Sequence, residues 1–444
     1  MADQTSSVTA DATSASQGVN QPSDFTLLVT IATGSGKLQD ITSQVMHFNL
    51  YESLSSPVMT GDMEMSDALD VVTNFSINGN EWIYVLLDKP GLNKPIRKAF
   101  RIYKISNRKF STTSAALYTI HFCSEELIIS SQSYVKRAYA GTIDVMIKNI
   151  LNDYLKASKK INDANFIKPN GNYSFSISRM RPFQAIEWLS SRAFGANQNL
   201  YFFYEDADGF NFTSFEQMIK NAPYATYVYQ PNDTADAANN YKSISYLNVD
   251  RDFDVLMGVK SGQFASTLHT FDLVSRSFNE KKLQGDSYGK DRLLNNAIST
   301  DSTKNRLGNT IFESTDSHTK FVITSDSDPT INPVTPQNWL LQNIQKSAQM
   351  KGLRYTINVP SDFELRVGRV VTLHLPAGNP QNPNDAAGEQ DKYRSGSNYL
   401  ITSLRHGISG QVSSTTLELL SDSLNTSLPA AAENSPILQQ IKAL

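Results

Sequence analysis

The sequence predicts an α+β protein that is mainly β, with two antiparallel β regions and an α/β unit between them. Three observations support this fold class. Apolar and polar residues alternate over much of 24–127, and they do so again near the end of the chain, which is typical of half-buried strands. Apolar residues recur at helical spacing within 143–155. The 444 residues are enough for several domains with their own cores.

The first β region contains segments rich in β-branched and aromatic residues: FTLLVTIA, QVMHFNLYE, EWIYVLL, FRIYKI and ALYTIHF. Turn-like pieces such as TGSGK and DKPGLNKP separate several of them. We therefore expect one β domain over residues 24–127, completed by strands from about 240–280. Residues 1–23 are small and polar and lack an apolar stretch, so they are expected to form a disordered arm rather than a signal peptide.

An α/β unit is expected over residues 128–239. Its first helix shows one apolar stripe from Ile143 to Leu155. A second helix is expected to begin at Pro182 and to end at Gly195. LYFFYED and FNFTSF then read as a hairpin around an Ala-Asp-Gly turn. The second helix is expected to brace this hairpin through Phe183, Ile186, Leu189, Phe203 and Gly209.

A second β domain is expected over residues 281–425, with a helix over 336–351 that Thr335 and Pro336 begin. Residues 376–397 are rich in Pro, Gly, Asn and Asp and exceed an ordinary connection. They read as an exposed functional loop or a disordered insertion. Residues 426–444 are expected to form a tail. Two interpretations of this tail remain, a short docking helix and a frayed terminus.

The two β regions end in a similar pattern. EWIYVLL, FRIYKISNRKFS and ALYTIHFCSEEL match GRVVTLHL, YLITSLRHGIS and TTLELLSDSL in order. When Ile102 is set against Ile401 and Leu127 against Leu424, the register differs by two residues across the turn. We infer two β domains of one design, although two unrelated antiparallel meanders would also look alike at this level.

Composition excludes several classes of protein. The net charge of −3 lacks the basic excess of a nucleic-acid binder, so no affinity for DNA is predicted. Cys123 is the only cysteine, which rules out an intramolecular disulfide and fits synthesis in the cytosol. No apolar run approaches the roughly 18 residues of a membrane span, so no membrane insertion is expected.

No motif in the chain points to catalysis, a metal or a cofactor. ATGSGKLQD fails as a phosphate loop because Leu38 stands where a Ser or Thr must bind magnesium. Asp250, Asp252 and Asp254 start like a calcium loop, but Val255 stands where a glycine turn is needed. The six histidines are scattered, and no Gly-x-Ser-x-Gly elbow occurs. A glycosidase stays open, because its two carboxylates need no local spacing.

The order of the segments resembles a known family. A β domain, then PFQAIEWLSSRA leading into LYFFYEDADGFNF, then a β domain ending in GRVVTLHL and YLITSLRHGIS is similar to the central baseplate hub protein of contractile-tailed bacteriophages. That family includes the late-control D proteins and the N-terminal part of type VI secretion spike proteins. The resemblance covers about residues 24–425. It implies two β-barrel domains of tail-tube type per chain.

The resemblance also implies a function without enzymatic activity. Three chains would form a ring that adapts the hexameric tail tube to a trimeric spike and forms part of the DNA channel. The implied partners are two further copies of the chain, the tail tube protein, a trimeric spike protein, and the tape-measure and baseplate wedge proteins. DNA would pass the lumen without specific binding, so lumen residues are expected to be neutral or acidic. The protein would reside in the virion. The alternatives are a carbohydrate-binding or carbohydrate-cleaving β protein and a hub of a related secretion system.

Overall fold

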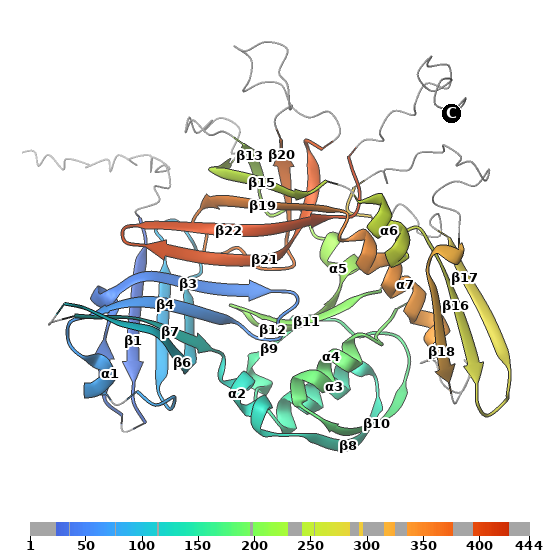
Figure 1. The fold of residues 1–444 in the computed structure, drawn as a ribbon, viewed down its shortest axis with the longest axis horizontal. Helices are drawn as coiled ribbons and strands as arrows, with labels where there is room; N and C mark the ends of the chain where they lie inside the picture. Colours follow the sequence, from blue (N-terminus) through green and yellow to red (C-terminus); the bar gives the residue numbers. More distant parts are fainter. Residues whose placement is uncertain are drawn as a thin grey trace, which may run out of the picture.

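A computed structural model describes the chain from residue 24 to residue 425 except for 35, 76, 113–114, 196–198, 230–241, 253, 285–292, 296–314, 325–334 and 376–393. The expected arm 1–23, the tail 426–444 and most of the 376–397 loop lie outside the described residues. Half-buried strands dominate, and Figure 1 shows four groups of elements: a blue sheet, an orange and red sheet, a green inserted unit and a yellow unit at the edge.

The first sheet consists of seven strands with a short helix, α1 (Val71–Asn74), and a 3-10 turn, η1 (Thr42–Gln44). The strands are β1 (Thr26–Ala32), β2 (Leu38–Asp40), β3 (Val45–Ser53), β4 (Thr60–Asp67), β5 (Trp82–Asp88), β6 (Ile96–Thr112) and β7 (Ala115–Cys123). They pair in the order β3-β4-β7-β6-β5-β1-β2. The segment 38–53 pairs with β1 at its start and with β4 further on, so one bent stretch of chain links the two ends of the series.

Alternation places the apolar face of this sheet inward. Phe48, Phe100 and Phe122 are all fully buried, and the ring centroids of Phe48 and Phe122 lie 5.7 Å apart. The core therefore forms where the period-two pattern of the sequence predicts it.

The second sheet repeats this strand order. Its strands are β13 (Thr226–Tyr229), β14 (Lys242–Ile244), β15 (Tyr246–Arg251), β19 (Leu353–Pro360), β20 (Val370–His374), β21 (Ser397–Ser409) and β22 (Val412–Ser421). β15 pairs with β19, β19 with β22, β22 with β21, β21 with β20 and β20 with β13, while β14 pairs with β13. Taken in chain order, each strand occupies the place of its counterpart among β1 to β7. One difference is direction: β1 is antiparallel to β5, whereas β13 is parallel to β20.

The two sheets are joined edge to edge. β21 pairs antiparallel with β3, from Ser403 opposite Ser53 to Ser409 opposite His47. The ladder therefore runs without a break from one sheet to the other, as the neighbouring blue and red strands in Figure 1 show.

The inserted unit packs helices against short sheets. It contains α2 (Glu125–Gln132), β8 (Val135–Gly141), α3 (Ile143–Asp153), η2 (Ser158–Lys160), β9 (Ile161–Phe166), β10 (Tyr173–Met180), α4 (Pro182–Ser190), β11 (Tyr201–Asp206), β12 (Gly209–Ser214) and α5 (Phe215–Ile219). The stripe predicted for the first helix is buried in α3 at Ile143, Met146, Ile147, Ile150 and Leu151. Helix α4 ends at Ser190 without a left-handed cap, so the expected role of Gly195 is wrong.

A further unit was not predicted as separate. It consists of α6 (Val255–Ser261), β16 (Ala265–Asp272), β17 (Phe278–Gln284), η5 (Thr315–Ser317), β18 (Thr319–Thr324) and α7 (Pro336–Gln349). The three strands form their own sheet in the order β17-β16-β18, and Leu341 of α7 packs on Leu268 of β16.

Two sequence expectations about sheet membership are therefore wrong. The segment of about 240–280 does not complete the first sheet, because β14 and β15 pair in the second sheet and β16 pairs with β17 and β18. The second sheet begins at Thr226 rather than at 281, and the helix expected over 336–351 packs on the separate three-stranded sheet. An alternating pattern in a sequence predicts which side chains of a strand are buried, but it does not predict which strand pairs with it.

Candidate functional site: the buried junction of the inserted hairpin

The tip of the β11–β12 hairpin is fixed by one carboxylate and one glycine. Asp206 Oδ1 accepts hydrogen bonds from the backbone amides of Asp208, at 2.8 Å, and Gly209, at 3.0 Å. Gly209 has a φ of 138°, and a Cβ there would lie 2.3 Å from the carbonyl oxygen of Lys160. Only glycine fits this backbone geometry and this close approach.

The structure brings the other four predicted residues together beside this tip. Phe183 of α4 lies 6.2 Å from Phe203 of β11, measured between ring centroids, and 6.4 Å from Phe210 of β12. Ile186 and Leu189 are fully buried in the same cluster. Helix α4 thus contacts both strands of the hairpin through its apolar face.

The hairpin tip also contacts the first sheet through charged groups. Glu205 Oε2 accepts hydrogen bonds from the amide of Met59, at 3.1 Å, and the hydroxyl of Ser124, at 2.5 Å. Lys98 of β6 lies 3.5 Å from Glu205 Oε1 and donates to the carbonyl oxygen of Asp206 at 3.0 Å. Glu205 is only 1% exposed, so these bonds replace its water.

A second carboxyl group links the tip to both sheets. Glu52, at the end of β3, accepts a hydrogen bond from the amide of Ala207 at 3.1 Å and a longer one from the amide of Val367 at 3.4 Å. Val367 precedes β20, so one side chain contacts the hairpin and a segment of the second sheet. We call Glu52, Lys98, Glu205, Asp206 and Ala207 the hairpin junction.

Burial sets the protonation of this junction. Desolvation raises the pKa of Glu52 to about 8, although the nearby Arg366 guanidinium lowers it in part. Desolvation also raises the pKa of Asp206, against the hydrogen bond of Asn211. Glu52 is therefore mostly a neutral acid at pH 7. Because Glu52 and Glu205 are each 1% exposed, these carboxyl groups are closed to a sugar chain.

Sequence reasoning found the hairpin and its helix but missed the charged half of the junction. Glu205 and Asp206 end an aromatic strand, where acids are ordinarily exposed. Two adjacent acids directly after YFFY were the only local signal. Glu52 and Lys98 are distant in sequence and carried none.

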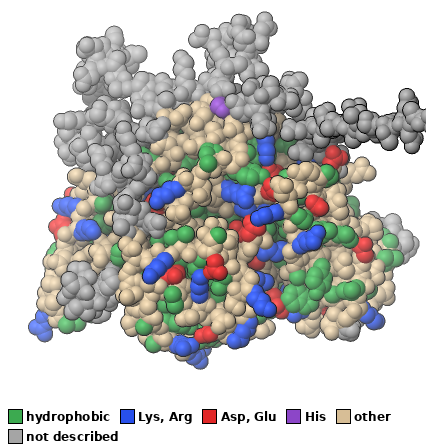
Figure 2. Space-filling view, turned by 180° about the vertical axis from the view of Figure 1, so that it is seen from behind, with side chains coloured by type: hydrophobic (Ala, Val, Ile, Leu, Met, Phe, Trp, Pro, Cys, Tyr) green, Lys and Arg blue, Asp and Glu red, His purple; other side chains and the backbone are tan. Residues whose placement is uncertain are grey.

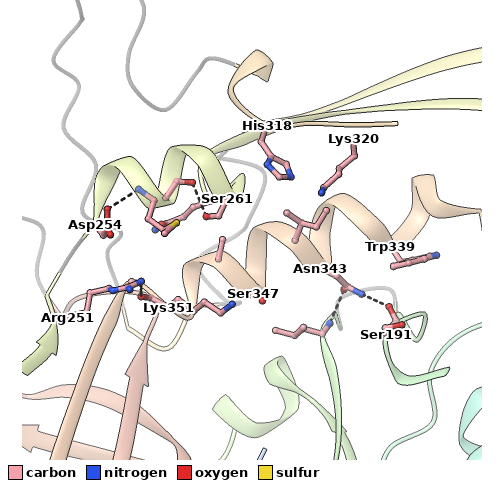
Figure 3. Close-up of a pocket in the computed structure, with 17 residues that line it drawn as sticks. Ser191, Arg251, Asp254, Ser261, His318, Lys320, Trp339, Asn343, Ser347 and Lys351 are labelled. Carbon is pink, nitrogen blue, oxygen red and sulfur yellow. Dashed lines mark hydrogen bonds between the residues drawn. The ribbon is translucent and has the colours of Figure 1, made fainter. Parts of the chain in front are cut away.

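A separate cavity of about 620 Å³ lies between α6 and α7 (Figure 3). Asn343 bridges its wall, since its side chain accepts from the amide of Leu200 and donates to the carbonyl oxygen of Ser191. Asp254 caps α6 by accepting from the amide of Met257. These hydrogen bonds of Asn343 and Asp254 serve the fold, and no group of three potential metal ligands occurs among the described residues. Nor does any described helix have the length and apolar character needed to span a membrane.

No protein family and no curated protein matches the sequence itself. Solved structures do match the fold. A tail protein from Neisseria meningitidis MC58 aligns with a TM-score of 0.52 at 12% identity, covering 90% of this chain and 99% of that chain. The chain shares its fold with this tail protein. A 43 kDa tail protein of prophage MuSo2 from Shewanella oneidensis also has a TM-score of 0.52, at 8% identity, covering 90% of this chain and 100% of that chain.

Proposed function

We propose that the protein is the structural baseplate hub of a contractile phage tail, a trimeric ring between the hexameric tail tube and a trimeric spike. The tail-protein fold supports the structural role. The proposal of a trimeric ring depends on the repetition of one strand order within one chain. Strands β1 to β7 show this order first, and the strands from β13 to β22 repeat it when β16, β17 and β18 of the separate sheet are left out. Three chains with two such units each offer six similar positions to a sixfold tube and threefold symmetry to a spike.

The hairpin junction fits the same role. It connects the inserted unit to β3 and β6 of the first sheet and to the segment before β20. A hub must keep its parts in fixed relative positions while force passes through it. Buried, hydrogen-bonded polar groups fix one arrangement because any other leaves them unpaired.

The proposed partners are further copies of this chain, the tail tube protein and a trimeric spike protein, with tape-measure and wedge proteins beside them. The proposed location is the virion. DNA would pass through the lumen without specific binding, for which the net charge of −3 is suitable. On the face in Figure 2, Lys and Arg side chains are interspersed with Asp and Glu rather than gathered in one basic field.

The test is to locate the chain in an assembled particle. Virions carrying an epitope tag on this chain are imaged by cryo-electron microscopy, and the detergent-resistant tail core is tested for co-purification with the spike. The proposal expects threefold density between tube and spike, around a hole about as wide as a DNA duplex. Tagged density elsewhere, or a monomer that binds glycans, would contradict it.

A further inference from the structure

The two sheets correspond in the first part of their hairpins. In β6 against β7, the register shifts between Ile102 and Lys104, and it shifts twice more, between Ser106 and Lys109 and between Phe110 and Thr112. In β21 against β22, it shifts between Ile401 and Ser403. Bulges are specific features of a strand, so this coincidence makes Ile102 equivalent to Ile401 and Lys104 equivalent to Ser403. The sequence comparison also sets Ile102 against Ile401.

In the second sheet the hairpin extends past its neighbour, and its edge is covered. β20 pairs with β21 only as far as Leu400. Beyond that point β3 takes the free edge of β21, with Ile408 opposite Phe48. Ile408 is consequently only 5% exposed.

In the first sheet no strand of the described part of the chain covers the same extension. β5 pairs with β6 only as far as Arg101, and the amide of Ile102 donates to the carbonyl oxygen of Glu81. From Tyr103 to Phe110, β6 has β7 as its one strand partner among the described residues. Phe110 is opposite Ala116, and in the second sheet Ile408 is opposite Ser413, the counterpart of Ala116. Phe110 therefore corresponds to Ile408, but it is 75% exposed.

The strand that would cover this edge also exists in the chain. β15 occupies the place of β3, yet within the described part of the chain it pairs with β19 alone, whereas β3 pairs with both β4 and β21. Tyr246 and Val249 of β15 are 57% and 48% exposed. Among the described residues, each chain therefore presents one β6 edge and one β15 edge that no strand covers.

We propose that the β6 edge of one copy pairs antiparallel with β15 of the next copy of this chain, as β21 pairs with β3 inside each copy. Equivalence fixes the register. Gly407 is opposite Asn49 in the existing ladder. Counted through the partner strands, the counterpart of Gly407 is Lys109, because the extra register shift after Ser106 takes up one residue of β6. The counterpart of Asn49, counted in the same way, is Asn248. Lys109 of one copy therefore lies opposite Asn248 of the other, and Phe110 opposite Leu247.

Charge favours this pairing over two β6 edges meeting each other. The β6 extension carries Lys104, Arg108 and Lys109, of which Arg108 lies 3.7 Å from Asp70 of its own chain. The β15 edge is less basic, with Asp250 and Arg251 at its end and Asp252 directly after it. Both carboxylates already have partners in their own chain, Asp250 in Thr356 and Asp252 in Arg394. Their role is to select the partner edge, while backbone hydrogen bonds and burial of Phe110 hold it.

The contact joins two different surfaces, so it repeats head to tail, and it closes as a ring when the rotation between copies divides a full turn. In a ring of three, β21–β3 ladders within chains would alternate with β6–β15 ladders between chains. This contact deepens the proposed function and rests on it for the number of copies.

The test uses cysteine pairs in the full chain, in a Cys123→Ala background. Cα atoms opposite each other in an antiparallel ladder are about 4.5–5.5 Å apart, which suits a disulfide. We expect the variant with Lys109→Cys and Asn248→Cys to form disulfide-linked trimers under mild oxidation. Equal mixtures of the two single variants should give linked dimers only.

The matched control replaces Lys109→Cys by Phe110→Cys and keeps Asn248→Cys. This slip of one residue turns the thiols to opposite faces of the sheet, so little linkage is expected. A threefold ring in tail particles without the 109–248 linkage would overturn the strand pairing and leave the proposed function standing. Absence of any ring of this chain in the particles would overturn both.

Discussion

The backbone amide of Ala207 donates a hydrogen bond of 3.1 Å to the carboxyl group of Glu52, 155 residues earlier in the chain. Glu52 lies in the strand that joins the two sheets, and Ala207 lies at the tip of the hairpin that α4 supports. This single contact couples the inserted unit to the ladder between the sheets. Its strength depends on the protonation of a buried acid.

We first predict a pH dependence that Glu52 causes. Its pKa is about 8 in the folded chain, whereas the ordinary value for a solvated glutamate is 4.5, so between these values the folded state binds the extra proton. The free energy of unfolding then falls as pH rises from 4.5 to 8, by at most about 1.4 kcal/mol per pH unit from this group. Below pH 4.5 this dependence on pH disappears, because both states are then protonated.

Glu52→Gln removes this titration. Urea unfolding of both proteins across about pH 5–9 should show wild type losing stability relative to Glu52→Gln as pH rises to about 8. Parallel pH profiles for the two proteins would contradict the raised pKa.

Truncation of the helix face should destabilise the inserted unit. Phe183 is buried against Phe203 and Phe210, so Phe183→Ala should cost roughly 3–5 kcal/mol. Glu187→Ala on the exposed side of the same helix is the control and should change stability little. Hydrogen exchange of β11 and β12 amides reports the loss locally. Equal exchange in both variants would show that α4 does not support the hairpin.

Local features of the fold could be predicted from the sequence, whereas the contacts between segments far apart in the chain could not. The stripe of α3, the start of α4 and the turn at Gly209 follow from spacing within a few residues. The burial of Glu52 and Glu205 depends on segments far apart in the chain. The paired acids after YFFY were the only local signal for Glu205, and Glu52 had none. For the same reason the alternating pattern of β15 indicated a strand but not its sheet.

The hairpin turn offers a test that separates steric overlap from backbone strain. Gly209 and Gly141 have similar φ values of 138° and 125°, but only Gly209 has a neighbour, the Lys160 carbonyl, where a Cβ would lie. Gly141→Ala should cost roughly 1–3 kcal/mol through strain alone. Gly209→Ala should cost more, because the β9–β12 contact must open. Thermal unfolding measures both, and equal losses would argue against the close approach.

The last prediction concerns a fully buried ion pair at the end of α7. Lys346 Nζ lies 2.5 Å from Asp422 Oδ2, and both side chains are completely inaccessible. Removing one partner leaves an uncompensated charge, so Lys346→Met should cost about 3–5 kcal/mol. The double variant with Asp422→Asn removes that charge while keeping an acceptor for the amide of Leu294, and it should recover part of the loss. Chemical denaturation of the four proteins gives the coupling energy, and strictly additive losses would show that the two charges do not stabilise each other.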